Sequence, residues 1–163
     1  ELAGVDNLVN DDSVDVMLSR AAGVPFVGTN GVLEPGQTYD SDLNAPVSIV
    51  ADVPLIDGVI EAGPFELTLP IQVFQYNFVF HAHDVRIHME VREDGTVHGY
   101  MGMGLPVEDI LIAANTPGTG ETGELVSQLA VDAADLMDAE GECSSLSGTM
   151  RFDTVSAFLF DEE

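Results

Sequence analysis

Residues 65–91 read FELTLPIQVFQYNFVFHAHDVRIHMEV and carry the strongest strand pattern in the chain. Apolar side chains alternate with polar ones, as in an extended segment that buries one face. One apolar set falls on even positions, Phe74, Tyr76, Phe78 and Phe80, and a second on odd positions, Val85, Ile87, Met89 and Val91. Strand side chains alternate strictly between two faces, so one regular strand would leave one set in water. The chain must therefore bulge, bend or turn between Ala82 and Val85.

Short apolar runs separated by turn-forming residues make up much of the remaining chain. The strand patterns lie at residues 13–19, 47–53, 55–61 and 148–160. Between strands, Glu93-Asp94-Gly95 predicts a three-residue hairpin loop with Gly95 in the left-handed conformation. Helical spacing predicts two short helices, over residues 106–115 and 122–138. The second is expected to bury Leu125, Leu129, Ala133 and Leu136, with Val126, Ala130 and Met137 beside them.

These patterns predict a mainly β fold. We expect an antiparallel β-sandwich or barrel-like domain, with two short helices inserted before the last strand. A length of 163 residues fits one domain. Residues 1–163 are therefore expected to form a single β-rich domain, with residues 1–12 as an extended N-terminal segment.

The net charge of the chain constrains the ionic environment in which its fold is stable. It has no lysine and four arginines against 29 Asp and Glu, for a net charge of −25. Because 45% of its residues are apolar, it does not have the composition of a disordered acidic tail. The charge is therefore expected on the surface of a packed body. Such a surface is stabilised by high ionic strength or by bound cations, and the sequence does not separate these two explanations.

The same negative charge excludes some classes of binding partner. Phosphate backbones and anionic membrane surfaces are repelled, so nucleic acid is not an expected partner. No apolar run reaches the ~20 residues of a membrane-spanning helix. Lysine-dependent Schiff-base chemistry and the usual P-loop are excluded because lysine is absent. The expected partners are proteins or assemblies with basic patches, or divalent cations.

The four histidines lie within one short window, and they suggest a metal site. His81 and His83 stand two residues apart, so a strand would point both to one side. If the bulge preserves a common polar face, Asp84 and His88 would share it, whereas His98 lies on the next predicted strand. Histidines so placed could bind zinc or copper. The alternative is that they are ordinary solvated residues on the outer face of a sheet.

A second candidate metal site is the run Asp40-Ser-Asp42-Leu-Asn44. Oxygen ligands at alternate positions are similar to the opening of a calcium loop. The similarity then ends, because Ala45 and Ala51 stand where an EF-hand has Gly and Glu, so an EF-hand is excluded. A looser calcium site remains open. The competing explanation is a turn, since Asp and Asn are common turn residues.

The sequence shows no motif for catalysis. Ser, His and Asp all occur, but no G-x-S-x-G elbow is present. Cys143 lacks the surroundings of a papain-type nucleophile, and as the one cysteine it cannot form an internal disulfide. We therefore expect a protein that is not an enzyme.

Several short segments resemble uncharacterised secreted or lipid-anchored envelope proteins of myxobacteria. They are Val5-Asp6-Asn7, residues 62–70 (AGPFELTLP), Glu93-Asp94-Gly95-Thr96, and the closing stretch from Gly141-Glu142-Cys143 to Ala157-Phe158-Leu159. This resemblance implies an extracellular or envelope location and no particular activity. The first residue is Glu1, and we interpret this start as processed or trimmed, consistent with a removed signal or lipid anchor.

Two functions from different classes follow. The first is a non-enzymatic extracellular or envelope domain that works through interaction, as a subunit of a larger surface assembly. The second is a metal-binding protein or metal-dependent enzyme, with zinc or copper at His81, His83 and His88 or calcium at Asp40, Asp42 and Asn44. A carbohydrate-binding module is a weaker third option, because the chain has no Trp for a stacking platform.

Overall fold

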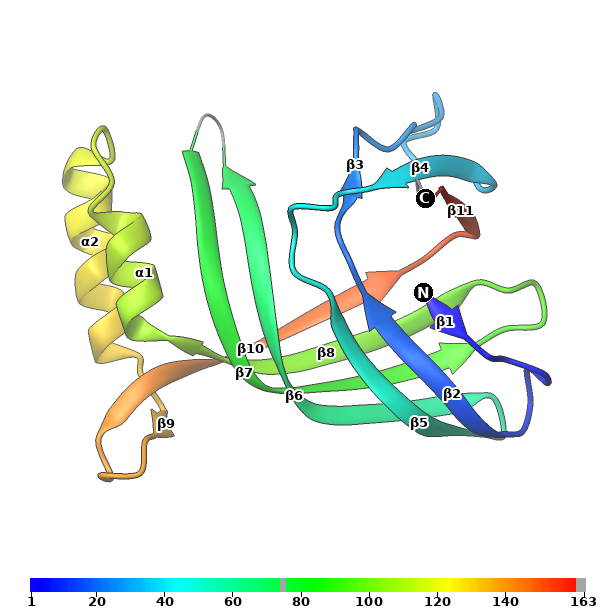
Figure 1. Cartoon of the computed structure of the whole chain (residues 1–163). Helices are drawn as coiled ribbons and strands as arrows, with labels where there is room; N and C mark the ends of the chain where they lie inside the picture. Colours follow the sequence, from blue (N-terminus) through cyan, green and yellow to red (C-terminus); the bar gives the residue numbers. More distant parts are fainter. Residues whose placement is uncertain (74–75, 161–163) are drawn as a thin grey trace. The chain divides into compact units, whose positions relative to one another are not determined.

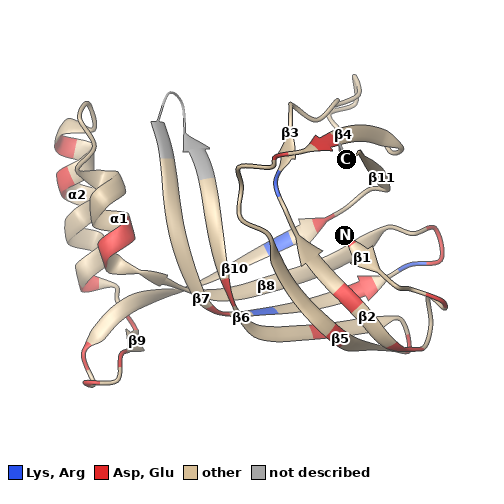
Figure 2. Ribbon diagram, in the orientation of Figure 1, with Lys and Arg blue, Asp and Glu red and all other residues tan. Residues whose placement is uncertain are grey.

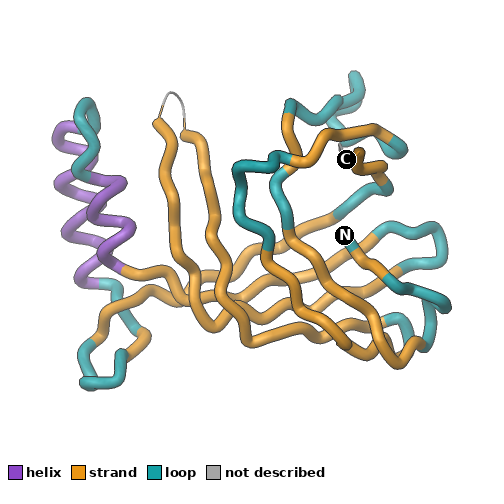
Figure 3. The backbone as a smooth tube through the Cα atoms, in the orientation of Figure 1, coloured by secondary structure: helices purple, strands orange, loops and turns teal. Residues whose placement is uncertain are grey.

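The computed structural model describes the backbone of residues 1–73 and 76–160 and the side chains of residues 1–70 and 78–160 (Figure 1). Strands make up most of these residues, and helix occurs in two neighbouring segments, α1 and α2 (Figure 3). The elements are β1 Leu2–Ala3, β2 Asp11–Leu18, β3 Ala21–Ala22, β4 Gln37–Ser41, β5 Ser48–Ile56, β6 Val59–Val73, β7 Tyr76–Val91, β8 Val97–Pro106, α1 Val107–Ala114, α2 Gly120–Asp132, β9 Leu136–Met137, β10 Cys143–Asp153 and β11 Ala157–Phe160.

The strands form two sheets. An eight-stranded sheet has the order β1-β2-β5-β6-β7-β8-β10-β9, and a three-stranded sheet has the order β11-β4-β3. In the large sheet, β2 and β5 are antiparallel, with Val14 opposite Val53 and Val16 opposite Val50. In the small sheet β4 pairs antiparallel with β3 and parallel with β11. The predicted mainly β class, with an antiparallel sheet and two helices ahead of the closing strands, is confirmed.

The chain divides into two compact units. Unit 1 comprises Glu1–Gly63, Ile87–Met101 and Arg151–Glu163, and unit 2 comprises Pro64–Arg86 and Gly102–Met150. The prediction that residues 1–163 form a single domain stays a prediction. The expected N-terminal segment, residues 1–12, contains β1 and the first residues of β2.

Each unit has its own apolar core. In unit 1, Val14 and Ile60 are fully buried, and burying such a side chain contributes about 1.5–3 kcal/mol to folding. Around them lie other buried residues of unit 1: Val16, Val53, Leu55, Ala62, Ile87, Met89 and Met101. The core of unit 2 is formed by Leu67, Ala82, Val85, Met103, Ala114 and Ala130.

The bulge expected between Ala82 and Val85 is present. Both side chains are 0% exposed although they are three positions apart, a spacing that would place them on opposite faces of a regular strand. Asp84 has a φ of +52°, in the left-handed region, and so supplies the extra residue that restores the buried face. Phe78 and Phe80 lie on one face, with ring centroids 6.5 Å apart. The remaining members of that predicted face, Phe74 and Tyr76, lie outside the described side chains.

The hairpin between β7 and β8 is also confirmed. Gly95 has a φ of +78°, and its N–H donates to the carbonyl of Arg92 over 2.9 Å. Arg92 N–H in turn donates to Thr96 O over 2.9 Å and closes the loop. The Thr96 hydroxyl and N–H both donate to Asp94, which lowers the pKa of that carboxyl. Local turn chemistry therefore decides where β7 ends.

Several of the predicted element boundaries were wrong. The stretch 65–91 belongs to two strands, because β6 ends at Val73 and β7 begins at Tyr76. The closing stretch 148–160 also belongs to two strands, β10 and β11, which lie in different sheets. Pro106 is the N-cap of α1 and not its first helical residue, since its ψ of 131° is extended.

Helix α2 differs most from its prediction. It spans Gly120–Asp132 instead of residues 122–138, and its buried residues are Gly123 and Ala130. Leu125 and Leu129, expected in the core, are 58% and 56% exposed. The reason is the close packing of α2 against α1, in which a Cβ at Gly123 would collide with the carbonyl oxygen of Ala114. Small residues therefore take the packed face and the larger ones face solvent.

This close approach predicts the effect of Gly123→Ala. In an exposed helix interior that change is favourable by roughly 0.5–1 kcal/mol. Here it should lower the free energy of unfolding by about 1–3 kcal/mol, because the added methyl group overpacks the contact between helices. Urea unfolding measures the difference, with Thr122→Ala on the exposed side of α2 as the control. A Gly123→Ala variant as stable as the parent would contradict the packing.

Candidate functional site

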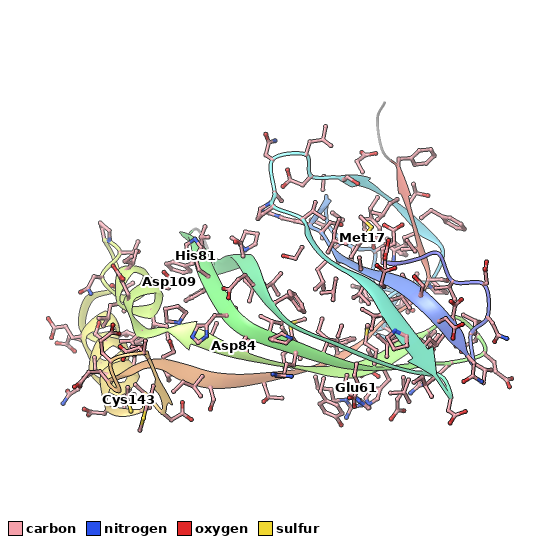
Figure 4. The ribbon with its side chains drawn as sticks, turned by 60° about the horizontal axis from the view of Figure 1, so that its bottom comes forward. Met17, Glu61, His81, Asp84, Asp109 and Cys143 are labelled. Atoms are coloured by element: carbon pink, nitrogen blue, oxygen red, sulfur yellow. The ribbon has the colours of Figure 1, made fainter. Side chains whose placement is uncertain are left out.

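His83 lies on β7 and makes two side-chain hydrogen bonds. Its Nδ1 is 2.9 Å from Oδ2 of Asp84, and its Nε2 is 2.9 Å from Oγ of Ser145 on β10. The His83 side chain is 30% exposed, whereas Ser145 is buried at 5%. Figure 4 shows Asp84 on the ribbon of β7. A carboxylate, an imidazole and a buried hydroxyl are thus joined by two consecutive hydrogen bonds.

A glycine on the intervening strand makes this contact possible. In the sheet, β8 lies between β7 and β10, so the His83 side chain must cross β8 to reach Ser145. It crosses at Gly104, where an added Cβ would collide with the imidazole ring. Because glycine has no side chain, the ring lies directly against the backbone of β8. Any other residue at position 104 would displace the ring.

The strands that carry His83 and Ser145 are both irregular next to these two residues. Asp84 is the left-handed residue of the β7 bulge. On β10, the register with β9 shifts between Cys143 and Ser145. Bulges redirect individual side chains and occur often beside functional sites. Two such irregularities therefore position His83, Asp84 and Ser145.

His81 is held by the first turn of α1. Its backbone N–H donates to Oδ2 of Asp109 over 2.6 Å, and its Nδ1 lies 3.0 Å from the same oxygen. Figure 4 shows these two labelled residues beside each other. The Asp109 side chain is largely buried, whereas His81 is mostly exposed. A carboxylate near a helix N-terminus also interacts favourably with the helix dipole, so Asp109 fastens α1 to β7.

The other two histidines, in unit 1, pair with carboxylates too. His88 Nδ1 is 3.3 Å from Glu61 Oε1, and its Nε2 is 3.9 Å from Glu90 Oε1. His98 Nδ1 is 2.7 Å from Asp153 Oδ1, and this hydrogen bond lowers the pKa of Asp153. Each histidine is therefore engaged by its own carboxylate.

This pairing bears on the predicted zinc or copper site. His81, His83 and His88 contact Asp109, Asp84 and Glu61 respectively. Within residues 1–73 and 76–160, no three His, Cys, Asp or Glu side chains are grouped so as to hold a metal ion. The zinc or copper site stays a prediction.

The acidic run at residues 40–44 adopts a turn. Asp42 Oδ1 accepts the Asn44 N–H at 3.1 Å, and its carbonyl accepts the Ala45 N–H at 2.9 Å. The second Asp42 oxygen lies 3.8 Å from Nε of Arg20. Asp40, on β4, lines a cavity of about 140 Å³ together with Leu43 and Phe160. Asp42 thus has the role of a turn residue, and calcium binding here also stays a prediction.

Helix α2 carries an exposed apolar surface. We call Leu125, Val126 and Leu129 the α2 stripe, because their spacing places them on one side of the helix and all three are exposed. Glu121 lies one turn before Leu125, and Asp132 lies three residues after Leu129. Figure 2 shows acidic residues on both helices. The segment 102–150 contains no Lys, Arg or His, so all of its charged side chains are acidic.

Sequence reasoning missed Ser145, Gly104 and Asp109. Ser145 stands 62 positions from His83, and Asp109 stands 28 from His81. Neither has a neighbouring motif that marks it. The signal that the sequence does offer is the alternation of glycine with a large residue at Gly102, Met103 and Gly104, because a glycine inside a strand often marks the close approach of another group.

Comparisons of the chain with protein-family models, curated proteins and solved structures found no match. The resemblance to secreted or lipid-anchored proteins therefore stays a prediction. Among the helices that the structure describes, neither α1 nor α2 has the length and apolar composition needed to cross a membrane.

Thermal melts in EDTA, zinc and calcium at matched ionic strength test both predicted metal sites. Ligand at a hundred times its Kd adds about 2.7 kcal/mol, which raises Tm by roughly 5–11 °C for a chain of this size. A zinc site at His81 and His83 predicts a shift that His83→Ala removes and His98→Ala retains. A calcium site predicts a shift that Asp42→Asn removes. Equal shifts in parent and variants would contradict binding at these residues.

Proposed function

We propose that this chain is an interaction domain of an extracellular or envelope assembly, in which α2 binds a protein partner with basic side chains. The observation that carries the proposal is the α2 stripe. Its helical spacing is that of a buried face, yet Leu125 and Leu129 are more than half exposed. Exposed apolar patches rimmed by polar residues are typical of protein-binding surfaces.

Charge specifies the kind of partner. Glu121 and Asp132 stand at the two ends of the stripe, and no basic residue occurs between residues 102 and 150. A partner groove with apolar residues at its centre and Arg or Lys at its rim complements this surface. A helix whose apolar side enters such a groove is a common mode of recognition.

A second copy of the chain fits this surface poorly. Each copy has a net charge of −25 and no lysine. Pairing two α2 stripes would bring like charges together, which is unfavourable at an interface. A different, basic partner is therefore the occupant that the charge favours. The extracellular or envelope location is supported by the resemblance noted in the sequence.

A synthetic amphipathic helical peptide, with leucines on one face and lysines at its margins, serves as the probe. Fluorescence anisotropy should show binding that the double substitution Leu125→Gln and Leu129→Gln weakens at least tenfold, since central apolar anchors each contribute about 1–2 kcal/mol. Thr122→Gln, on the same helix, should bind as the parent does. All these variants keep the parent charge.

Two outcomes would contradict the proposal. Unchanged affinity in the double variant would mean that the peptide binds through charge alone. Sedimentation that shows self-association lost in the same double variant would identify a second copy as the occupant.

A charge variant tests the acidic residues at the ends of the stripe. Glu121→Gln with Asp132→Asn should reduce the salt dependence of peptide binding while the apolar contribution remains.

A further inference from the structure

We propose that Ser145 is an activated nucleophile, with His83 as its general base and Asp84 as the group that orients His83. The proposal does not depend on the α2 stripe. It rests on the hydrogen bonds between His83 Nδ1 and Asp84 Oδ2 and between His83 Nε2 and Ser145 Oγ, each 2.9 Å. A serine nucleophile requires a base within this distance and a third group that orients the base.

The two bonds define what each group does. An ionised Asp84 only accepts hydrogen bonds, so Nδ1 of the neutral ring carries the proton. Nε2 then has a free lone pair directed at the Ser145 hydroxyl, the arrangement in which a histidine removes a proton from serine. Asp84 would also stabilise the imidazolium formed by that transfer.

Other features show that the contact is built by more than one element. Among the residues that the structure describes, Ser145 is the buried polar one. His83 reaches it only because position 104 is glycine. The bulge at Asp84 and the register shift before Ser145 bring the imidazole and the hydroxyl toward the space left by Gly104. The His83 side chain is 30% exposed, so solvent reaches the imidazole, whereas Ser145 is 5% exposed.

The chemistry is acyl transfer from a carboxylic ester. Ser145 Oγ attacks the ester carbonyl carbon while its proton passes to His83 Nε2. The new C–O bond forms, the bond to the alcohol oxygen breaks, and the alcohol leaves with the proton from Nε2. Water then attacks the acyl-serine and gives its proton to Nε2; the acid leaves and Oγ regains the proton. No oxidant, reductant or metal is needed.

Charge and burial indicate the substrate class. Asp84 adjoins His83, Asp109 holds the neighbouring His81, and the net charge is −25. Anionic esters are therefore repelled. Because Ser145 is only 5% exposed, the acyl group must be small. The fitting substrates are neutral or cationic esters with short acyl chains.

Diisopropyl fluorophosphate, a small neutral reagent, tests the nucleophile directly. Attack by Oγ forms an O–P bond, releases fluoride and leaves a stable adduct that peptide mass spectrometry can locate. In the full chain the adduct is expected on Ser145, with labelling unchanged in Ser144→Ala. His83→Ala should slow labelling at least tenfold. His98→Ala, which removes a different carboxylate-paired histidine, should not.

Asp84→Asn separates orientation from folding. Asparagine has the same shape and tolerates the left-handed conformation, so the bulge should persist. Labelling should nevertheless slow at least tenfold, because an amide stabilises neither the required tautomer nor the imidazolium. Circular dichroism verifies that each variant is folded. No adduct on Ser145, an adduct elsewhere, or equal rates in the parent and Asp84→Asn would overturn the proposal.

Discussion

The extra residue that Asp84 adds to β7 is the constraint on which much of this structure depends. Without it, the apolar side chains on the two sides of the bulge would face opposite sides of the sheet, and one set would be exposed. A left-handed conformation at a non-glycine residue is unfavourable, so the surrounding sheet must stabilise it. Burial of Ala82 and Val85 supplies that stabilisation. The same backbone irregularity turns the Asp84 carboxylate toward His83.

The large negative charge has structural uses within the fold. Asp11, Asp94, Asp135 and Asp153 accept hydrogen bonds from nearby donors, and these bonds lower the pKa of each carboxyl. For Asp135 the main cause is the Ser147 hydroxyl. Such groups stabilise the folded state above their ordinary pKa, and that contribution is lost as pH falls through the lowered values. Protonation also relieves repulsion among the other carboxylates, so the two effects oppose each other in acid.

What the sequence could predict was mostly local. The bulge follows from two apolar sets of opposite parity, and the hairpin follows from the preference of Gly95 for positive φ. The packed face of α2 does not follow from its own residues. It depends on how closely Gly123 approaches Ala114 of α1. For that reason the prediction that Leu125 and Leu129 are buried was wrong. The contact of His83 with Ser145 depends on the order of three strands, which residue spacing does not reveal.

Once the strand order is known, the residue at position 104 alone tells whether the contact between His83 and Ser145 can form. Any substitution of Gly104 would place at least a methyl group where the imidazole lies. A chain with this topology therefore loses the contact between His83 and Ser145 when Gly104 is replaced. In a newly sequenced protein with the same strand order, the residue at this position would tell whether the imidazole and the hydroxyl can meet. Histidine and serine at the flanking positions would carry little meaning without the glycine between them.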